Sequence, residues 1–528
     1  MESTSSELLA LGIQHHKEGR LQEALNAFQA VLEQNSFDVD ALTRIALILS
    51  GSGVPAIIAA GMELLRRVCV IEPNYGSFHN LANALRGHFC YHESLYYFDR
   101  ALELNPHFVP SLYGKSSILE GMREGQQALD CLMLALKLKP NDCWAYNDIG
   151  YFHFRQGNFQ ESVDYFAKAY EISPTVDIQA NLALALHYNA QTNMGIAMMR
   201  ECLAKKPENP GYHQNMSSML FMAGAFKEAH QHYKWRWKTG PLAGAARHFP
   251  VPEWNGENLN GKTILIYGEQ GFGDSLQYCR FIPMMAALGA RVILDVPESL
   301  VRLMTTLKGV HQVVATGQEL PPFDYNLPIM DLPHVFGTSV ETIPAEVPYL
   351  FADAKDYDVW KNRLAHAGRN KKIGLAWAGN PRLKHPYDLS PRDSRRSVDI
   401  EAFAPILAIP GLSFYSLQKL YGQVPAGVPI TDFMPQCDDF ADTAALMNQL
   451  DLVVTVDSSV VHLAGALGKP VLLLNRFDSC WRWLRWREDS PWYPTLRMLR
   501  QKTPNDWGEV LQRLEKELTE FARQPVGV

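Results

Sequence analysis

The sequence has 528 residues, of which 47% are hydrophobic and 20% charged, and its formal net charge is −7. This balance predicts a folded chain of several domains. The acidic charge argues against nucleic acid as a main partner, because such binding depends on basic patches. The eight cysteines are scattered, without a CxxC pair or zinc spacing, so we expect free thiols in a reducing compartment and no metal site.

The N-terminal segment and the hydropathy pattern bear on the location of the protein. The first residues, MESTSSELLALG, lack the basic start and apolar stretch of a signal peptide. No apolar run is long enough to predict a transmembrane helix. We therefore expect a cytoplasmic protein without a transmembrane segment.

A repeat occupies the first half of the chain, where prolines recur at spacings of 33, 34, 34 and 33 residues. They are Pro73, Pro106, Pro140, Pro174 and Pro207. Because proline cannot continue a helix, each one ends the second helix of a helical pair. Small and aromatic residues at matching positions, such as Gly150, Ser162 and Phe166, let the paired helices approach closely. The pattern resembles the tetratricopeptide repeat (TPR), and we expect about seven repeats over residues 1–240.

One polar position recurs on the first helix of several pairs, two residues before the small residue. It is occupied by Asn80, Asp148, Asn181 and Asn215. A row of carboxamides can hydrogen-bond a peptide backbone without reading its side chains. The row resembles the asparagine ladder of the nucleocytoplasmic O-GlcNAc transferases, whose TPR groove holds the protein substrate, although Gly114 interrupts it. The alternative interpretation is a polar, solvated groove face.

Beyond residue 240 the repeat gives way to a loop rich in Gly, Pro and Asn, which marks a domain boundary. Apolar runs then alternate with helical stretches. The runs are TILIYG (263–268), RVILDV (291–296), KIGLAWAG (372–379), LSFYSLQ (412–418), DLVVTV (451–456) and PVLLLN (470–475). Continuous apolar strands separated by helices predict parallel sheets covered on both faces. The Pro-rich stretch 321–348 splits them into two groups, which indicates two Rossmann-like lobes that bind ligands at their strand ends.

A glycine-rich turn, EQGFGD (269–274), follows the first of these strands and opens a helix. Gly271 and Gly273 let a ligand approach the backbone, and the start of a helix attracts anions. These glycines are therefore candidate donor-binding residues. Asp274 is a candidate catalytic carboxylate, with helix capping as its alternative role.

A second helix start follows the strand DLVVTV, in the segment DSSVVHLAGALGKP (457–470). Its hydroxyls and backbone N–H groups form an anion cradle. His462 lies in the first turn of this helix, where its alternative role is packing within the domain. The candidate donor-binding residues of this segment are Asp457, Ser458, Ser459 and His462.

Polar loops follow two further strands. The loop after KIGLAWAG is basic, which suits a phosphate leaving group unless the loop is simply solvated. The Trp-rich run 481–494 indicates a lid, a sugar platform or core packing. The candidate donor-binding residues are Asn380, Arg395 and Arg396 in the basic loop, together with Gln418 and Lys419 at the end of the strand LSFYSLQ.

The motifs EQGFGD, WAGN with a following RRS, SLQK, DLVVTVDSSVVHLAGALGKP, WRWL and DSPWYP occur in this order. Over about residues 260–500 they resemble bacterial TPR-linked glycosyltransferases related to the lipopolysaccharide heptosyltransferases. The resemblance implies a GT-B fold and an inverting, metal-independent reaction of a nucleotide-activated sugar, without a cofactor. By position, Asp274 matches the proposed general base of that family, and residues 457–462 match its donor motif. Arg395 or Arg396 matches the cation that neutralises the leaving phosphate, a choice left open because the preceding loop is longer than the family predicts.

The sequence thus predicts a multidomain protein, with an all-α TPR superhelix at residues 1–240 followed by an α/β GT-B fold. We expect its lobes at residues 241–355 and 356–528, the second ending in a helix. The predicted activity is transfer of a sugar from a nucleoside-diphosphate or CMP-linked donor to Ser or Thr of a protein held by the TPR groove. Flagellin is a candidate acceptor, because bacterial flagellin glycosyltransferases look similar. Alternatives are a lipid-linked or surface glycan as acceptor, and a non-catalytic TPR scaffold that binds nucleotide.

Overall fold

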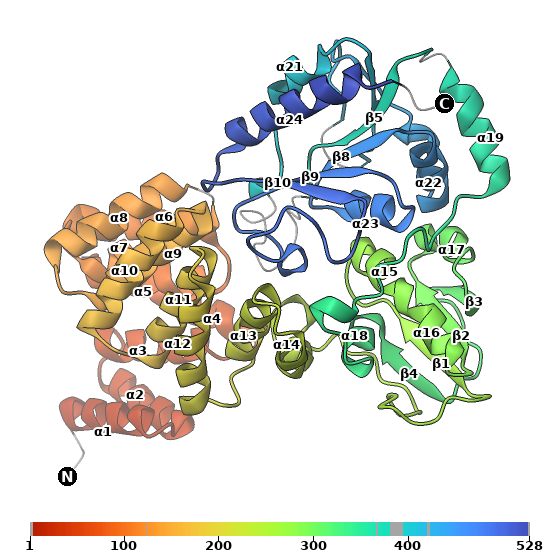
Figure 1. Ribbon diagram of the computed structural model, residues 1–528. Coiled ribbons are helices and arrows are strands. Elements are labelled where there is room, and N and C mark those ends of the chain that lie inside the picture. Colours follow the sequence, from red (N-terminus) through yellow and green to blue (C-terminus); the bar gives the residue numbers. More distant parts are fainter. Residues whose placement is uncertain (1–3, 123, 366–367, 381–393, 420–422, 526–528) are drawn as a thin grey trace. The chain divides into compact units, whose positions relative to one another are not determined.

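The structure, a computed structural model, describes residues 4–122, 124–365, 368–380, 394–419 and 423–525 (Figure 1). The chain forms two compact units. The first comprises Met1–His153 and Glu161–Ile178, and the second comprises Phe154–Gln160 and Gln179–Val528. The division between the units therefore falls inside the helical array, well before residue 240, where the repeat pattern ends.

Helices form the first half of the chain, as predicted, and in the described residues fourteen of them, α1–α14, precede the first strand. Successive helices pack as pairs, for example α1 with α2, α5 with α6 and α13 with α14. Their bounds are α1 Ser5–Lys17, α2 Leu21–Gln34, α3 Val39–Ser50, α4 Pro55–Ile71, α5 Tyr75–Gly87, α6 Tyr91–Leu104, α7 Val109–Gly121, α8 Gly125–Leu138, α9 Cys143–Gln156, α10 Phe159–Ile172, α11 Val176–Tyr188, α12 Thr192–Lys205, α13 Pro210–Met222 and α14 Phe226–Tyr233.

Small residues set the spacing of these pairs. A Cβ on Gly150 of α9 would lie 2.9 Å from the ring of Phe166 in α10, so the ring can pack there only against glycine. The hydroxyl of Ser162 donates to the carbonyl of Gly150 (2.9 Å), and the serine at the same position of an earlier pair, Ser94, donates to the carbonyl of Ala82 (2.6 Å). The repeated contact explains why small and aromatic residues recur with the period of the array.

The second unit contains two sheets whose strands all run parallel. The smaller sheet has the order β3-β2-β1-β4 and the larger one the order β10-β9-β8-β5-β6-β7. The strands are β1 Thr263–Tyr267, β2 Arg291–Val296, β3 Val310–Ala315, β4 Tyr325–Pro328, β5 Lys371–Ala376, β6 Leu412–Ser416, β7 Ile430–Thr431, β8 Leu452–Val456, β9 Val471–Asn475 and β10 Leu496–Arg500. The predicted α/β region is thereby confirmed.

Helices cover both sheets (Figure 1). The main ones are α15 Phe272–Tyr278, α16 Ile282–Ala287, α17 Glu298–Met304, α18 Leu332–Val335, α19 Ala354–Arg363, α21 Ala404–Leu407, α22 Phe440–Asn448, α23 Ser459–Ala466 and α24 Trp507–Arg523. The C-terminal helix α24 buries Val510, Leu514 and Leu518 in the core of the larger sheet, beside Ile373 of β5. This apolar stripe at helical spacing fixes the predicted terminal helix on the sheet.

Two details differ from the sequence prediction. The Pro-rich stretch 321–348 does not merely separate the strand groups, because it contains β4, which pairs with β1. The lobe boundary expected at residue 355 falls inside α19, which packs on α22.

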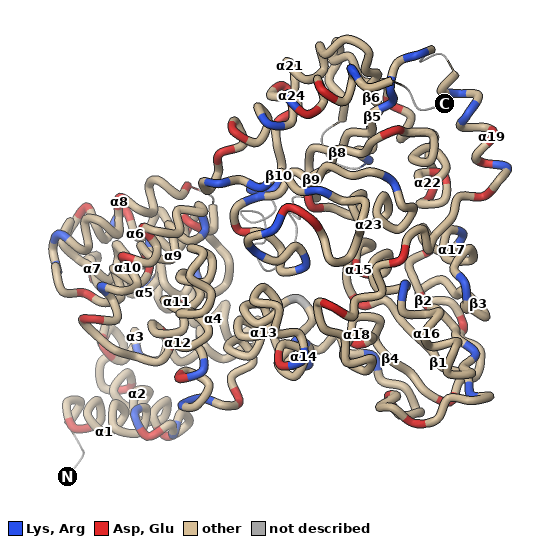
Figure 2. Tube along the Cα trace, in the orientation of Figure 1, with Lys and Arg blue, Asp and Glu red and all other residues tan. Residues whose placement is uncertain are grey.

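None of the helices in the described parts of the chain is both long and apolar enough to cross a membrane. Lys and Arg are interspersed with Asp and Glu along both units (Figure 2).

Candidate active site

The glycine-rich loop 268–274 joins β1 to α15, and local hydrogen bonds fix its backbone. The N–H of Gly268 donates to the carbonyl of Asp295 at the end of β2 (2.9 Å). The N–H of Gly271 donates to Oδ2 of Asp274 (2.8 Å), so this carboxylate caps the start of α15. The capping role does not exclude a chemical one, because a carboxylate has about four lone-pair sites.

A buried cation lies beside the same carboxylate. The guanidinium of Arg482 contacts Oδ1 of Asp274, and its Nε donates to Oε1 of Gln277 (2.7 Å). The side chain of Arg482 is 11% exposed and that of Asp274 is 18% exposed. Asp274 is thus held at both oxygens while part of it stays open to a ligand.

His462, from the second helix start, is buried in α23. Its Nδ1 lies 2.9 Å from the hydroxyl of Tyr493, and its ring stacks on that of Trp483 with centroids 5.5 Å apart. Burial, with the cations of Arg482 and Arg280, lowers the pKa of His462 well below its usual value. The imidazole is therefore neutral at neutral pH, and Tyr493 holds its orientation.

The two predicted motifs touch each other. A Cβ on Gly273 would lie 2.7 Å from Cδ2 and 3.4 Å from Nε2 of His462, so no larger residue fits at position 273 without displacing the ring. Helices α15 and α23 pack together at this point. The strand-end edge of the smaller sheet therefore meets that of the larger sheet at Gly273 and His462.

Arg396 bridges two neighbouring strand ends of the larger sheet. Its guanidinium donates to the carbonyl of Asp457 after β8 (2.9 Å) and to that of Asn380 after β5 (3.3 Å). The side chain crosses Gly379 so closely that a Cβ there would lie 2.1 Å from its Nε. Ser458 follows Asp457 and caps α23, since its Oγ accepts from the N–H of Val460 (3.3 Å). Asn380, Arg396 and residues 457–459 thus share one edge.

The other predicted donor-binding residues are distributed around this edge. Oε1 of Gln418 accepts from the N–H of Ala378 (3.0 Å), which ties the end of β6 to the end of β5. Lys419 points away from them, because its ammonium contacts the carbonyl of Cys437 before α22. The basic loop between Asn380 and Ser394 lies outside the described residues.

Arg395 is held elsewhere. Its guanidinium donates to Oδ2 of Asp478 (2.9 Å) and contacts the carbonyl of Arg155 near the end of α9. A Cβ on Gly157, in the turn between α9 and α10, would lie 2.8 Å from Cδ of Arg395. Of the two arginines left open by the sequence, Arg396 therefore lies at the strand ends, whereas Arg395 joins the segment 154–160 to the larger lobe.

The predicted acceptor-binding residues all lie on first helices of their pairs. Asn80 is in α5, Asp148 in α9, Asn181 in α11 and Asn215 in α13. Asp148 is exposed and the other three are half-buried. Asn80 and Asp148 belong to the first compact unit, and Asn181 and Asn215 to the second. Their role in binding a polypeptide stays a prediction. Gly114, which interrupts the row, leaves room for the ring of Phe98, 2.1 Å from a Cβ at that position.

Sequence reasoning missed the residues that hold the site together. Trp483, Trp492 and Tyr493 are fully buried, so these rings of the Trp-rich run pack in the core, whereas Trp486 is exposed. The same run supplies Arg482 to Asp274. The density of Trp was the available signal, but it did not single out the arginine between two of them.

A second missed cluster, here called the buried clamp, consists of Arg236, Glu269 and Asp331. Arg236 follows α14 and donates to both oxygens of Glu269 (3.0 and 2.9 Å) and both oxygens of Asp331 (3.0 and 3.0 Å). All three side chains are at most 10% exposed. Burial raises the pKa of Glu269 to about 7, although Arg236 opposes the shift. Through Glu269, the clamp holds the first residue of the EQGFGD turn.

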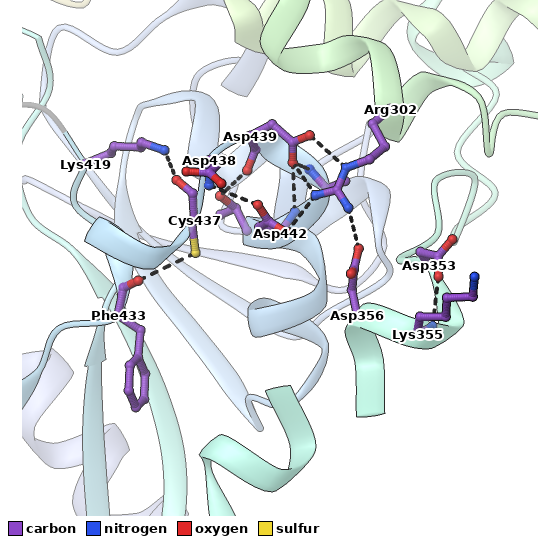
Figure 3. Close-up of polar contacts among 12 residues, drawn as sticks. Arg302, Asp353, Lys355, Asp356, Lys419, Phe433, Cys437, Asp438, Asp439 and Asp442 are labelled. Carbon is purple, nitrogen blue, oxygen red and sulfur yellow. Dashed lines mark hydrogen bonds and ion pairs between the residues drawn. The ribbon is translucent and has the colours of Figure 1, made fainter. Parts of the chain in front are cut away.

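A third cluster, here called the surface clamp, links α17 to the larger lobe (Figure 3). Arg302 donates to both carboxylate oxygens of Asp439 (2.8 and 2.8 Å), to Asp442 (2.6 Å) and to Asp356 of α19 (2.6 Å). Phe440, next to Asp439, packs against Phe272 of the glycine-rich loop with ring centroids 5.1 Å apart. The start of α22 thus contacts both α17 and the loop that carries Asp274.

Comparisons with known protein families match two regions of the chain. The model for glycosyltransferase family 9 (heptosyltransferase) matches residues 423–490, and a tetratricopeptide repeat model matches residues 143–173. The chain joins tetratricopeptide repeats to a glycosyltransferase-type domain. The glycosyltransferase match includes β8, the start of α23 with His462, β9 and Arg482.

The chain is also similar to two curated proteins and one solved structure. Protein FlbA of Caulobacter vibrioides is 24% identical over 444 residues, which cover 76% of this chain and 72% of FlbA. Protein NPGR1 of Arabidopsis thaliana is 24% identical over 165 residues, 30% of this chain and 23% of that protein. The crystal structure of MamA protein is 22% identical and covers 33% of this chain and 94% of its own, with a TM-score of 0.29. A TM-score of 0.29 is too low to support a conclusion about this chain.

Proposed function

We propose that the chain is an inverting, metal-independent glycosyltransferase that moves a sugar from a nucleotide-activated donor to a Ser or Thr hydroxyl of a protein. The observation that carries the proposal is the contact between Gly273 and His462. It joins the helix starts that follow β1 and β8, and ligands of parallel α/β sheets bind at such strand ends. The family 9 match over residues 423–490 supports a sugar-transfer reaction there.

The donor phosphates would bind at the start of α23. Backbone N–H groups of its first turn attract anions, and Arg396 places a cation at the same edge, between the carbonyls of Asn380 and Asp457. A cation at this position stabilises the charge that develops on the leaving phosphate. Neutral His462 adds no second charge and instead shapes the wall next to Gly273.

Asp274 would act as the general base. The acceptor oxygen forms a bond to the anomeric carbon while the bond from that carbon to the phosphate oxygen breaks. Asp274 takes the hydroxyl proton, and the electron pair of the broken bond leaves with the phosphate. Arg482 and the N–H of Gly271 hold the carboxylate in place without using all its lone pairs.

The polypeptide acceptor is proposed from the fusion itself. TPR arrays bind proteins on the surface formed by their first helices, and Asn80, Asp148, Asn181 and Asn215 lie on such helices. Flagellin is a candidate acceptor, and the reaction would take place in the cytoplasm.

The test compares Asp274→Asn with the wild-type chain. Asparagine keeps an oxygen to cap α15 but cannot take the proton, so we expect kcat to fall about 10²- to 10⁴-fold, with unchanged thermal shift by the nucleotide. Sugar transfer is measured as the increase in the intact mass of purified flagellin after incubation with the chain and each nucleotide sugar of a panel. Asp358→Asn, at an exposed position of α19, is the matched control.

Three outcomes would contradict parts of the proposal. Transfer by Asp274→Asn at the wild-type rate removes Asp274 from the base role. Sugar found on a membrane-extracted glycan and on no protein favours the glycan acceptor. A thermal shift with a nucleotide but no transfer to any acceptor favours the scaffold that binds nucleotide, whereas no shift with any nucleotide or nucleotide sugar contradicts the donor site itself.

A further inference from the structure

A cavity of about 560 Å³ opens in the second unit, and its lining includes neither Gly273 nor His462. Four segments line it: the start of α12, the end of α13, residues 340–341 and residues 484–486. Met222 and Leu484 are buried in its wall, whereas Met194 is 55% and Trp486 82% exposed. The volume lies in the range of ligand sites, about 300 to 1,000 Å³.

The backbone around the cavity is strained. Among the described residues other than glycine, five have a positive φ, and three of them line this cavity: Ala190 (66°), Leu484 (47°) and Trp486 (67°). Such conformations cost about 1 to 3 kcal/mol each and gather at ligand clamps and active sites. Trp486 has this backbone conformation although its ring is exposed, and no ring contact within the described part of the chain accounts for it.

Hydrogen bonds from two arginines hold residues 483–485 in place. Arg500 of β10 donates to the carbonyls of Leu484 (2.7 Å) and Trp483 (3.2 Å), and Arg485 donates to the carbonyl of His187 in α11 (3.2 Å). Two arginines therefore fix residues 483–485 while the ring of Trp486 stays free of the core. A rigid support under an exposed aromatic ring is the arrangement expected of a preorganised binding residue.

The same segment leads directly to the candidate active site. Arg482 contacts Asp274, and Trp483 stacks on His462. An extended residue spans at most 3.6 Å, so Trp486 lies within about 14 Å of Arg482 along the chain. A ligand that touches both the cavity and Asp274 therefore needs only a few residues of extended polypeptide.

The lining suits a polypeptide more than a nucleotide or a metal. The first-turn N–H groups of α12, on Thr192, Asn193 and Met194, are donors for peptide carbonyls. The apolar wall of Met222 and Leu484 takes an aliphatic or aromatic side chain, and the exposed Trp486 also lines the cavity. Charges of both signs, Arg485 and Glu341, leave no strong field for a polyphosphate.

We propose that this cavity binds an extended segment of the acceptor polypeptide, a few residues from the hydroxyl that receives the sugar. The inference rests on the proposed function, because it names the partner of the same site. It adds a second contact region for the acceptor, separate from the polar row on the helical array. An apolar side chain of the acceptor inserts between Met222 and Leu484, and its backbone runs over the start of α12.

The experiment uses the purified full chain and a pool of fluorescent peptides, each with a central Thr and randomised flanks. Binding is measured by anisotropy, and the bound peptides are sequenced. Trp486→Ala removes the exposed ring from the lining, and Ala223→Trp fills the mouth from an exposed position. Both variants should raise the Kd of the selected peptides at least about tenfold, as for an aromatic hot spot. Phe351→Ala, which removes another half-exposed ring, should leave the Kd unchanged.

Amide hydrogen exchange locates the bound peptide independently of any effect of the variants on folding. Peptide binding to the wild-type chain should slow exchange at residues 192–194. Selected peptides whose Kd and protection are the same in all variants would overturn the inference, as would a pool in which nothing binds. Loss of oligosaccharide binding in Trp486→Ala, with no peptide bound, would assign the cavity to a glycan instead. Peptide binding at the cavity without sugar transfer from any donor would refute the proposed function and leave the binding site standing.

Discussion

The buried clamp and the surface clamp both support the glycine-rich loop, but their ion pairs differ in exposure to solvent. In the first, Arg236 meets Glu269 and Asp331 where the exposed fractions are 3%, 1% and 10%. In the second, Arg302 is 45% exposed and meets three aspartates. A buried pair is costly to break because it leaves an unpaired charge in the interior, whereas an exposed pair is screened by salt and contributes little. The loop is thus fixed firmly to the smaller lobe and only loosely to the start of α22.

The largest effect is expected from Arg236→Met, which leaves two carboxylates buried without their cation. We expect the free energy of unfolding of the second unit to fall by about 3 to 5 kcal/mol, measured by urea denaturation. Adding Glu269→Gln and Asp331→Asn should recover most of the loss. A single-variant loss below about 1 kcal/mol would show that the clamp is not buried as described.

The pH dependence of the buried clamp gives the next largest effect. Burial and the charge of Asp331 raise the pKa of Glu269 from 4.5 to about 7, against the attraction of Arg236. An acid with a raised folded-state pKa contributes stability below its unfolded pKa, and this stability is lost as pH rises through the folded value. Between about pH 4.5 and 7 the wild-type chain should lose up to about 3 kcal/mol relative to Glu269→Gln. Parallel pH profiles of the two proteins would contradict the assignment.

The smallest effect is expected from Arg302→Met. Exposed ion pairs contribute about 0 to 1 kcal/mol, so unfolding should change little. Hydrogen exchange in residues 268–274 should nonetheless speed up, because Phe440 supports Phe272 only while α22 stays in place. High salt should bring the wild-type chain to the exchange rate of the variant.

Arg497→Met removes another exposed pair, with Glu517, and serves as the control. It should leave exchange in the loop unaltered. An Arg302→Met effect as large as that of Arg236→Met would erase the contrast between the two clamps.

The sequence predicted the strands in the middle of each sheet and missed those at the edges. The missed strands are β3, β4, β7 and β10, which terminate the two sheets. Central strands such as β8 are buried throughout and read as continuous apolar runs. The edge strand β3, VHQVVA, has exposed polar residues at His311 and Gln312, so its sequence is not a continuous apolar run and does not stand out as a strand.

The meeting of the two motifs was predictable for a related reason, since carboxyl ends of parallel strands gather at one edge of each sheet. The side chains that fix the motifs were not predictable. Arg482 is 208 residues from Asp274, and Arg236 is 95 residues from Asp331. No local pattern marks such pairs, because they depend on how distant elements pack.

The boundary between the compact units changes what counts as the smallest working enzyme. Phe221 of α13 stacks on Trp481 with ring centroids 4.2 Å apart, and Phe226 of α14 lies 6.3 Å from Trp492. A truncation at residue 240, where the repeats end in sequence, would strip these rings from the segment that carries Arg482. The helices α13 and α14 therefore pack against the segment that carries Arg482, although by sequence they belong to the repeats.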